Sequence, residues 1–287
     1  MALAASVLEA ALKRDRAVVV GGLVTVITVA WLYILLGAGM GMSAFEMTRM
    51  SSPAGLGGEG TGGPAMTSVG MAGAVQAMAP VAWTPAYAVL MLFMWWIMML
   101  AMMLPSAAPM ILLFAAINRK QRERGAPYVA TGIFAGGYLL AWGAFSLVAV
   151  AAQWALERAL LMSDTMVGTS VTLGGAILVA AGIWQMTPLK NACLRHCRSP
   201  IHFLSHNWRK GRLGALRMGL EHGAFCLGCC WVLMALLFYG GVMNLYWIVG
   251  LCLFVLIEKL APAGVLVGRL AGAGLIAWGG TLLAGAL

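Results

Sequence analysis

Residues 86–104 read AYAVLMLFMWWIMMLAMML, an unbroken apolar stretch without one charged side chain. The hydrocarbon core of a bilayer is about 30 Å thick, and a helix of roughly 20 apolar residues crosses it. Backbone N–H and C=O groups find no hydrogen-bond partner in lipid, so a spanning segment satisfies them internally as a helix. The stretch therefore predicts a membrane-spanning helix, and its apolar character continues to residue 117.

The composition of the whole chain leads to the same class. Of 287 residues, 62% are hydrophobic and 9% are charged, and the mean hydropathy is +0.92. A soluble domain is about half apolar and a quarter charged, because charges must cover its surface. The composition excludes a soluble enzyme, a disordered protein and a nucleic-acid-binding protein, the last despite a net charge of +9. We expect the lipid bilayer to be the partner of this surface.

Seven stretches of the chain reach, or nearly reach, the length and apolar character that a crossing requires. These are residues 17–36, 86–117, 128–152, 166–187, 219–240, 243–261 and 264–286. The predicted fold class is all-α, a polytopic transmembrane helix bundle of about seven spans.

The basic residues predict the orientation of this bundle. Of the 18 Lys and Arg residues, all but Arg49 and Arg158 fall on one side of the predicted spans. Positive residues remain on the cytoplasmic side of a membrane. We therefore expect a cytoplasmic N-terminus and a periplasmic C-terminus in a bacterial inner membrane, and an odd number of spans agrees with this.

The topology predicts three regions. Residues 1–36 form an N-terminal anchor span, because the apolar run and the segment before it are long for a cleaved signal peptide. Residues 37–85 form a periplasmic loop rich in Gly and Met, and thioethers are soft metal ligands. Residues 86–287 form a six-span membrane domain, in which 188–218 is a cytoplasmic basic loop that contains Cys and His.

The cysteines and histidines are concentrated in one part of the chain. All six cysteines and all four histidines lie between residues 193 and 252, and none lies in the 37–85 loop. Disulfides form in oxidising compartments. The distribution therefore argues against a disulfide framework and favours reduced thiols on the cytoplasmic side or within the bilayer.

The motif HGAFCLGCC begins the fifth predicted span, and its candidate ligands are His222, Cys226, Cys229 and Cys230. At about 100° per residue, the imidazole and the three thiols fall on one stripe of a helix. A bare thiolate inside a bilayer is costly, and a bound soft cation removes that cost, which predicts a metal site. Neutral cysteines also pack as small buried residues, so the motif leaves both interpretations open.

Further candidate ligands lie on either side of this motif. They are Cys193, Cys197, His202 and His206 in the basic loop, and Met98 and Met102 on a methionine stripe of the second span. We interpret the loop residues as an inner acceptor and the methionines as an outer approach for a soft ion. The alternatives are an interfacial helix among basic residues that repel a cation, and methionines that pack adaptably.

Two carboxylates lie near the inner ends of predicted spans. Glu221 precedes His222, and Glu258 precedes Lys259. Each is a candidate relay, Glu221 as a hydrogen-bond acceptor that orients the imidazole and Glu258 as a carboxylate that faces the bundle. The alternative is that they form ion pairs with Lys259 at the membrane interface.

Several segments match one known family together, in order and in spacing. They are residues 98–106 with Pro109, residues 184–200, residues 222–234 and residues 241–259. They resemble the bacterial family of predicted metal-binding integral membrane proteins, domain-of-unknown-function family 2182. The resemblance covers most of residues 85–262. It implies a multi-span inner-membrane protein with a metal site on the Cys and His positions of those segments.

These features predict a protein that binds or translocates a soft metal ion. Ligation by several cysteines favours Cu(I) or Zn over Mg or Ca, and of these two we expect Cu(I). The sequence contains neither a GxxxxGK[ST] motif nor a soluble catalytic domain, and we assign no catalytic residue. Movement of the ion is then passive, coupled to another ion or driven by a partner, and a soluble metal chaperone is the expected partner outside the membrane.

Two other functions stay open on the sequence. One is an accessory or assembly subunit of a larger membrane metalloenzyme complex, since the glycine runs permit close packing against partner membrane subunits. The other is a membrane thiol oxidoreductase that uses Cys226 and Cys229. Placement of these thiols on the reduced cytoplasmic side disfavours the second.

Overall fold

The computed structural model describes residues 2–51, 82–123, 129–163 and 166–286 of the chain. Within these ranges the chain is helical, and its only β pairing is an isolated bridge between Met162 and Gly168. The predicted all-α class is therefore confirmed. The Gly-rich middle of the predicted 37–85 loop, residues 52–81, lies outside the described residues.

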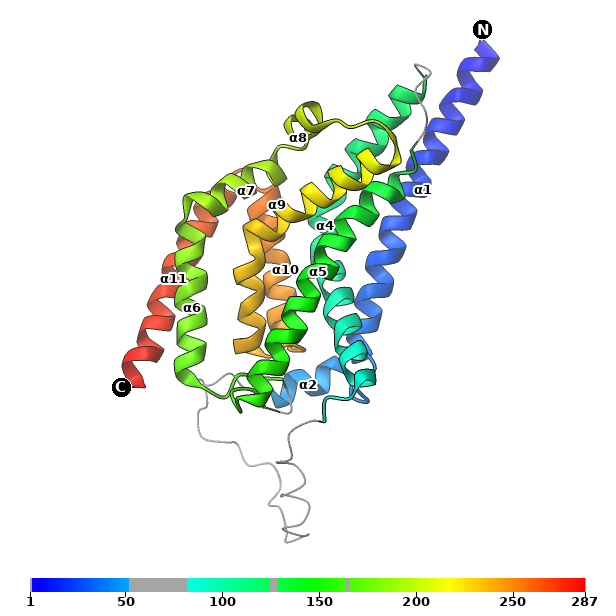
Figure 1. The fold of residues 1–287 in the computed structure, drawn as a ribbon. Coiled ribbons are helices and arrows are strands. Elements are labelled where there is room, and N and C mark those ends of the chain that lie inside the picture. Colours follow the sequence, from blue (N-terminus) through cyan, green and yellow to red (C-terminus); the bar gives the residue numbers. More distant parts are fainter. Residues whose placement is uncertain (1, 52–81, 124–128, 164–165, 287) are drawn as a thin grey trace.

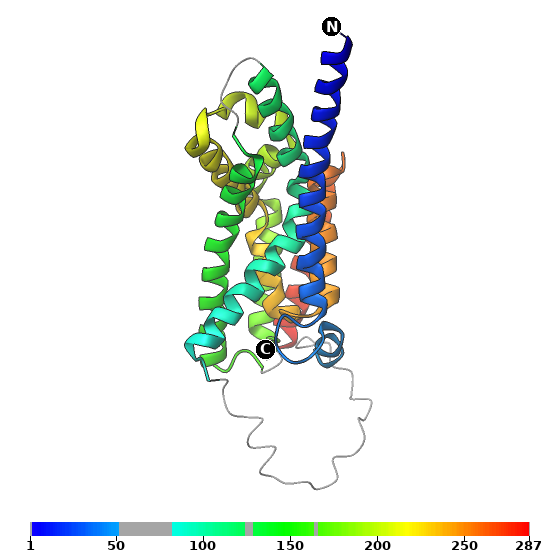
Figure 2. The ribbon, with the colours of Figure 1, turned by 90° about the vertical axis from the view of Figure 1, so that its right-hand side faces the viewer.

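The long helices run side by side, and short helices lie at either end of them (Figure 1). The described helices are α1 (Ala2–Leu35), α2 (Ala44–Met50), α4 (Pro85–Glu123), α5 (Thr131–Arg158), α6 (Val171–Met186), α7 (Pro188–Arg198), α8 (Pro200–Asn207), α9 (Gly211–Gly240), α10 (Leu245–Leu260) and α11 (Gly264–Gly285). The view in Figure 2 shows α1 along one side of the bundle, extending beyond it at the N-terminal end.

Five of the described helices are long and apolar enough to cross a membrane, namely α1, α4, α5, α9 and α11. The pair α6 and α7 meets the same test together, although the two are bent by 65° at the break between them, which raises the number to six. Each of the seven predicted spans overlaps a helix, and the one that does not meet this test is α10, which has 16 residues and corresponds to the sixth predicted span. A crossing by α10 stays a prediction.

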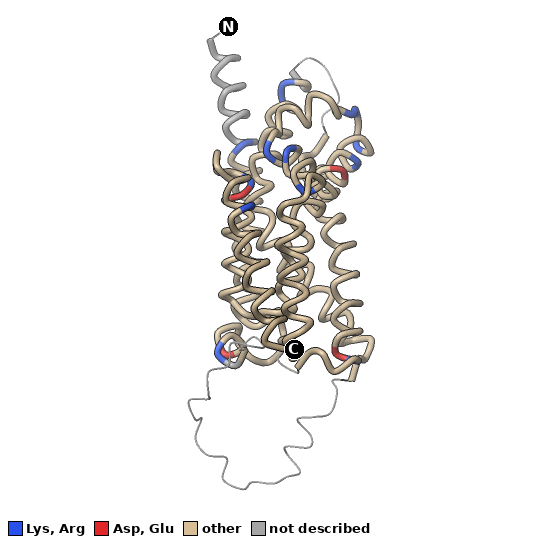
Figure 3. Tube along the Cα trace, turned by 90° about the vertical axis from the view of Figure 1, so that its left-hand side faces the viewer, with Lys and Arg blue, Asp and Glu red and all other residues tan. Residues whose placement is uncertain are grey.

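The charged residues are distributed as the basic pattern of the sequence predicts. Most Lys and Arg residues of the described chain gather at the end of the bundle where α1 begins (Figure 3). The chain starts at that end and finishes, after α11, at the opposite one (Figure 1). The side of the membrane on which each end lies stays a prediction.

Close contacts between helix backbones occur at glycines. A Cβ on Gly219 of α9 would collide with the backbone oxygen of Phe134 in α5. A Cβ on Gly279 of α11 would lie 2.7 Å from the backbone oxygen of Gly175 in α6. Small residues let helices approach closely in a membrane, and these glycines serve contacts within the chain. Gly136 has nothing within 4 Å of its Cβ position.

Helices occupy most of the segment predicted as a basic loop. Thr187 ends α6 and caps α7, since its hydroxyl accepts a hydrogen bond from the Lys190 N–H at 3.2 Å. Pro188 follows Thr187, and a residue before proline is disfavoured in helical conformation, so the chain turns there. A helix also starts at Pro200. The turn directs α7 along α9.

Candidate metal centre

Four cysteine side chains from two helices converge in the bundle, and we call them the thiol cluster. They are Cys197 of α7 and Cys226, Cys229 and Cys230 of α9. The thiol of Cys226 lies near the other three thiols, and that of Cys229 also lies near Cys197 and Cys230. The three thiols of α9 are buried and Cys197 is half-buried. All six cysteines of the chain are free thiols.

A glycine in α9 lets α7 reach the cluster. A Cβ on Gly228 would lie 2.6 Å from the Sγ of Cys193, so a larger residue at this point would displace that thiol. Cys193 lies one helical turn before Cys197 and beside this glycine. Of the four residues predicted as an inner acceptor, Cys197 therefore joins the thiols of α9, and Cys193 borders them.

Two buried polar side chains from other helices contact Cys226. The ammonium of Lys259, at the end of α10, donates to the Sγ of Cys226 at 2.9 Å and to the hydroxyl of Ser106 at 3.1 Å. The hydroxyl of Tyr138, in α5, shares a hydrogen bond with the same sulfur at 3.2 Å. Cys226 is therefore the point at which α5, α7, α9 and α10 meet.

Neither contact follows from the sequence pattern. Tyr138 precedes Cys226 by 88 positions, and no local pattern marks it as a neighbour of the motif. Lys259 was considered only as an ion-pair partner for Glu221 or Glu258. The sequence feature that marks Lys259 is its position at the end of an apolar run, because an ionisable residue in a membrane-spanning segment is a functional candidate.

Glu258 forms its ion pair with a different lysine. Its carboxylate contacts the ammonium of Lys190 from α7, and that ammonium also donates to the side-chain oxygen of Gln185. Both charged groups are buried. Successive residues of a helix point about 100° apart, so Glu258 and Lys259 face different neighbours. The interfacial pair considered between them is not formed.

The imidazole of His222 is buried one turn before Cys226. It stacks on the rings of Tyr138, at 5.6 Å between centroids, and Phe134, at 6.3 Å. Its Nδ1 has no hydrogen-bond partner among the described residues. A buried ring nitrogen without a partner is unusual, and it is free to serve as a metal donor. No described hydrogen bond joins the ring to the thiols.

Three other predicted residues lie apart from the thiol cluster. The carboxylate of Glu221 pairs with Arg209 at 2.9 Å and Arg217 at 3.1 Å, so it meets neither the imidazole nor Lys259 as considered. The rings of His202 and His206 stack at 4.1 Å between centroids, on one face of α8. Both rings are exposed, and no described contact joins them to the thiols.

The methionine stripe of α4 is buried and ends at the thiol cluster. Its fully buried members are Met91, Met94, Met98, Met99, Met102 and Met103. The Sδ of Met103 lies 4.0 Å from the Sγ of Cys230. Met98 and Met102 therefore belong to a stripe whose last sulfur contacts a thiol. The hydroxyl of Ser106 donates to the carbonyl oxygen of Met103 at 2.9 Å.

The thiols are held by hydrogen bonds in this conformation. Those of Cys229 and Cys230 each donate to the carbonyl oxygen of Cys226 at 3.0 Å. Among the described residues, no group of three or more His, Cys, Asp or Glu side chains is placed to enclose a metal ion. A structural zinc site uses four such ligands.

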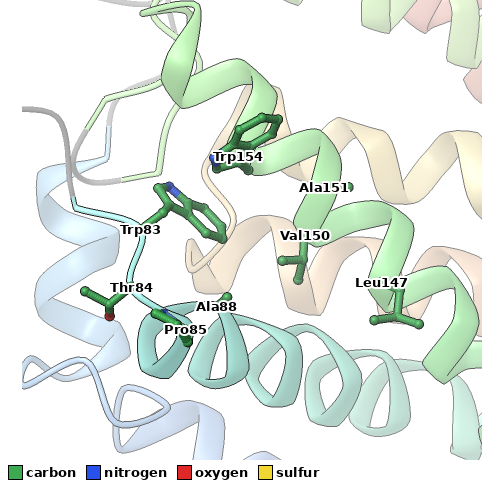
Figure 4. A pocket seen from close by; sticks show the side chains of 8 residues that line it. All are labelled: Trp83, Thr84, Pro85, Ala88, Leu147, Val150, Ala151 and Trp154. Carbon is green, nitrogen blue, oxygen red and sulfur yellow. The ribbon is translucent and has the colours of Figure 1, made fainter.

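A cavity of about 450 Å³ lies at the other end of α4, between its first turns and the second half of α5 (Figure 4). Trp83 and Trp154 face it, together with small and aliphatic side chains. The indole N–H of Trp83 donates to Glu157 at 2.6 Å. No sulfur or imidazole lines this cavity, so it is not the candidate metal centre.

Comparison with known proteins identifies a family for most of the chain. Residues 92–282 match the PpoB2 family, which is described as a copper chaperone. The matched range contains the thiol cluster, Lys259, Tyr138 and most of the methionine stripe. A metal-related family, as the resemblance implied, is thereby confirmed. No curated protein and no solved structure matches the chain. The chain belongs to the PpoB2 family of copper chaperones.

Proposed function

We propose that this protein binds Cu(I) at the thiol cluster, within a membrane-spanning bundle, and passes it to an acceptor. The observation that carries the proposal is the position of Cys226, whose buried thiol lies near those of Cys197, Cys229 and Cys230 and accepts a hydrogen bond from Lys259 at 2.9 Å. Membership of a copper chaperone family supports copper as the ion. Soft thiolate and thioether ligands select Cu(I).

Cu(I) suits this donor set because two thiolates are enough to bind it. The thiols of Cys229 and Cys230 turn away from the backbone oxygen of Cys226 when they become ligands. His222 would add a nitrogen donor from the preceding turn of α9, where its Nδ1 has no other partner among the described residues. A buried site also excludes water, which strengthens the attraction between thiolates and a cation.

The neighbours of the cluster supply an approach and an exit. On one side, the methionine stripe of α4 ends with Met103 at 4.0 Å from Cys230. On the other side, Cys193 lies beside Gly228, one turn from Cys197. Copper would move by exchange between neutral thioethers and thiolates. The acceptor would be a soluble metal chaperone or a membrane partner subunit, and the membrane would be the bacterial inner membrane.

The test measures Cu(I) binding by the full-length protein, purified in mild detergent under reducing conditions. Competition with a chromogenic Cu(I) chelator gives the affinity of wild type and of two serine variants. Cys226→Ser removes the central thiol, and we expect it to abolish tight binding. Cys252→Ser is the matched control, since this thiol is buried and its one described hydrogen bond goes to the carbonyl oxygen of Met102, at 3.4 Å. Equal affinity in Cys226→Ser and wild type contradicts the proposal.

A further inference from the structure

Lys259 is a buried cation whose described contacts are a thiol and a hydroxyl. Its side chain is 5% exposed, and its ammonium contacts Cys226 and Ser106. In the part of the chain that the structure describes, no carboxylate forms an ion pair with it. The nearest carboxylate in sequence, Glu258, is held by Lys190.

A lysine in this position is costly unless a negative group lies beside it. Transfer of an ammonium from water into an apolar interior is highly unfavourable without a partner. The sulfur at 2.9 Å is the group that would carry a negative charge when copper is bound, because the thiolate is the metal ligand. The ammonium therefore lies against the ligand atoms of the cargo site.

Counting charges shows which ion this arrangement favours. Cu(I) with two thiolates carries one negative charge, and the ammonium of Lys259 brings the total to zero. A divalent ion with two thiolates is already neutral, and the ammonium leaves one positive charge. A net charge inside a bilayer is unfavourable. With two thiolates bound, the lysine thus favours the monovalent ion.

We propose that Lys259 is a specificity-determining residue of the cargo site, whose positive charge neutralises the dithiolate complex of a monovalent soft ion and disfavours the divalent one. The inference rests on the proposed function, because it concerns the same thiols. It goes further in assigning the choice between Cu(I) and Zn(II) to a residue that is not itself a ligand. If Lys259 only supported the fold, its substitution would lower the affinities for Cu(I) and Zn(II) alike.

The experiment compares Cu(I) and Zn(II) affinities of the full-length protein in detergent across a series at position 259. Lys259→Arg keeps the charge. Lys259→Gln keeps hydrogen-bond donors toward Cys226 and Ser106 without the charge, and Lys259→Met removes both. We expect Lys259→Gln and Lys259→Met to lower the affinity for Cu(I) by about tenfold or more without lowering the affinity for Zn(II). Lys259→Arg should retain the preference for Cu(I) over Zn(II). Thermal unfolding confirms that each variant is folded. If Lys259→Met does not fold, the affinities of Lys259→Gln decide whether the charge selects the ion.

The outcomes separate this inference from the proposed function. Absence of Cu(I) binding in wild type defeats the proposed function itself. Tight binding in wild type, together with an unchanged or raised Cu(I) affinity in Lys259→Gln, overturns only the role of Lys259. An equal fall for both ions also overturns it, because a loss of general support would then explain the result.

Discussion

Lys190, in the first turn of α7, forms an ion pair with Glu258, near the end of α10, and both side chains are buried. The pair connects the bent helix that carries Cys197 to the helix that carries Lys259. The side-chain oxygen of Gln185 accepts a further hydrogen bond from the same ammonium. This small polar network therefore fixes the position of α7, and with it the position of the half-buried thiol in the cluster.

Lys190→Met should destabilise the protein strongly, because it leaves the carboxylate of Glu258 buried without its partner. Breaking one half of a buried pair costs about 3–5 kcal/mol. The double variant Lys190→Met/Glu258→Leu removes both charges, and we expect it to recover most of the loss. Thermal unfolding in detergent measures the difference. Equal unfolding temperatures for the single and the double variant contradict this account.

Gly219→Ala should loosen the contact between α9 and α5. The added Cβ meets the backbone oxygen of Phe134, which cannot move as a side chain does, and overpacking of this kind costs about 1–3 kcal/mol. Gly136→Ala is the matched control on α5, because nothing lies within 4 Å of its Cβ position. Thermal unfolding in detergent measures the stability of both variants. A larger loss of stability in Gly136→Ala than in Gly219→Ala argues against the glycine contact.

Copper should protect one thiol of α7 from alkylation. Cys193 and Cys197 are both half-buried, whereas the other four cysteines are buried, so a maleimide should label these two in the folded protein. Cu(I) bound at the thiol cluster should slow the labelling of Cys197 more than that of Cys193. Mass spectrometry of labelled peptides measures both rates. Equal protection of the two thiols, or none, is inconsistent with a site that includes Cys197.

The double variant Met98→Leu/Met102→Leu should slow copper movement without changing copper affinity. Exchange between Met and Leu conserves volume and costs less than about 1.5 kcal/mol per site, but it removes two thioethers from the buried stripe. We expect slower Cu(I) uptake by proteoliposomes and unchanged binding in detergent. Met186→Leu, at an exposed position near the end of α6, is the control. Uptake at the wild-type rate in the double variant excludes the stripe as a route.

The helical class and the position of the membrane-crossing segments were readable from composition and run length. Apolar runs such as residues 86–104 behave alike in any context, because lipid permits few backbone structures. The same holds for the face shared by Cys226, Cys229 and Cys230, since helical periodicity alone brings them together. The break at Thr187 lies at the end of the fourth predicted span. The helix α7 that follows it was not predicted, because its basic residues indicated a loop.

The partners of each charged or sulfur-containing side chain could not be derived in this way. Sequence neighbours such as Glu258 and Lys259 point in different directions, and each meets a residue more than 30 positions away. Glu221 likewise pairs with arginines rather than with the adjacent imidazole. A single rotation or shift of one helix would change all these pairs while leaving the sequence pattern intact.

The sequence by itself determined an α-helical bundle for a bilayer, with basic residues at one end and a stripe of thiols on one helix. These properties depend on about 20 residues at a time, which is the length over which lipid and helical periodicity act. Only the tertiary structure decided that Cys197, Tyr138 and Lys259 meet at Cys226. Those contacts depend on where glycines let helices approach, and on which buried charges find partners across the bundle.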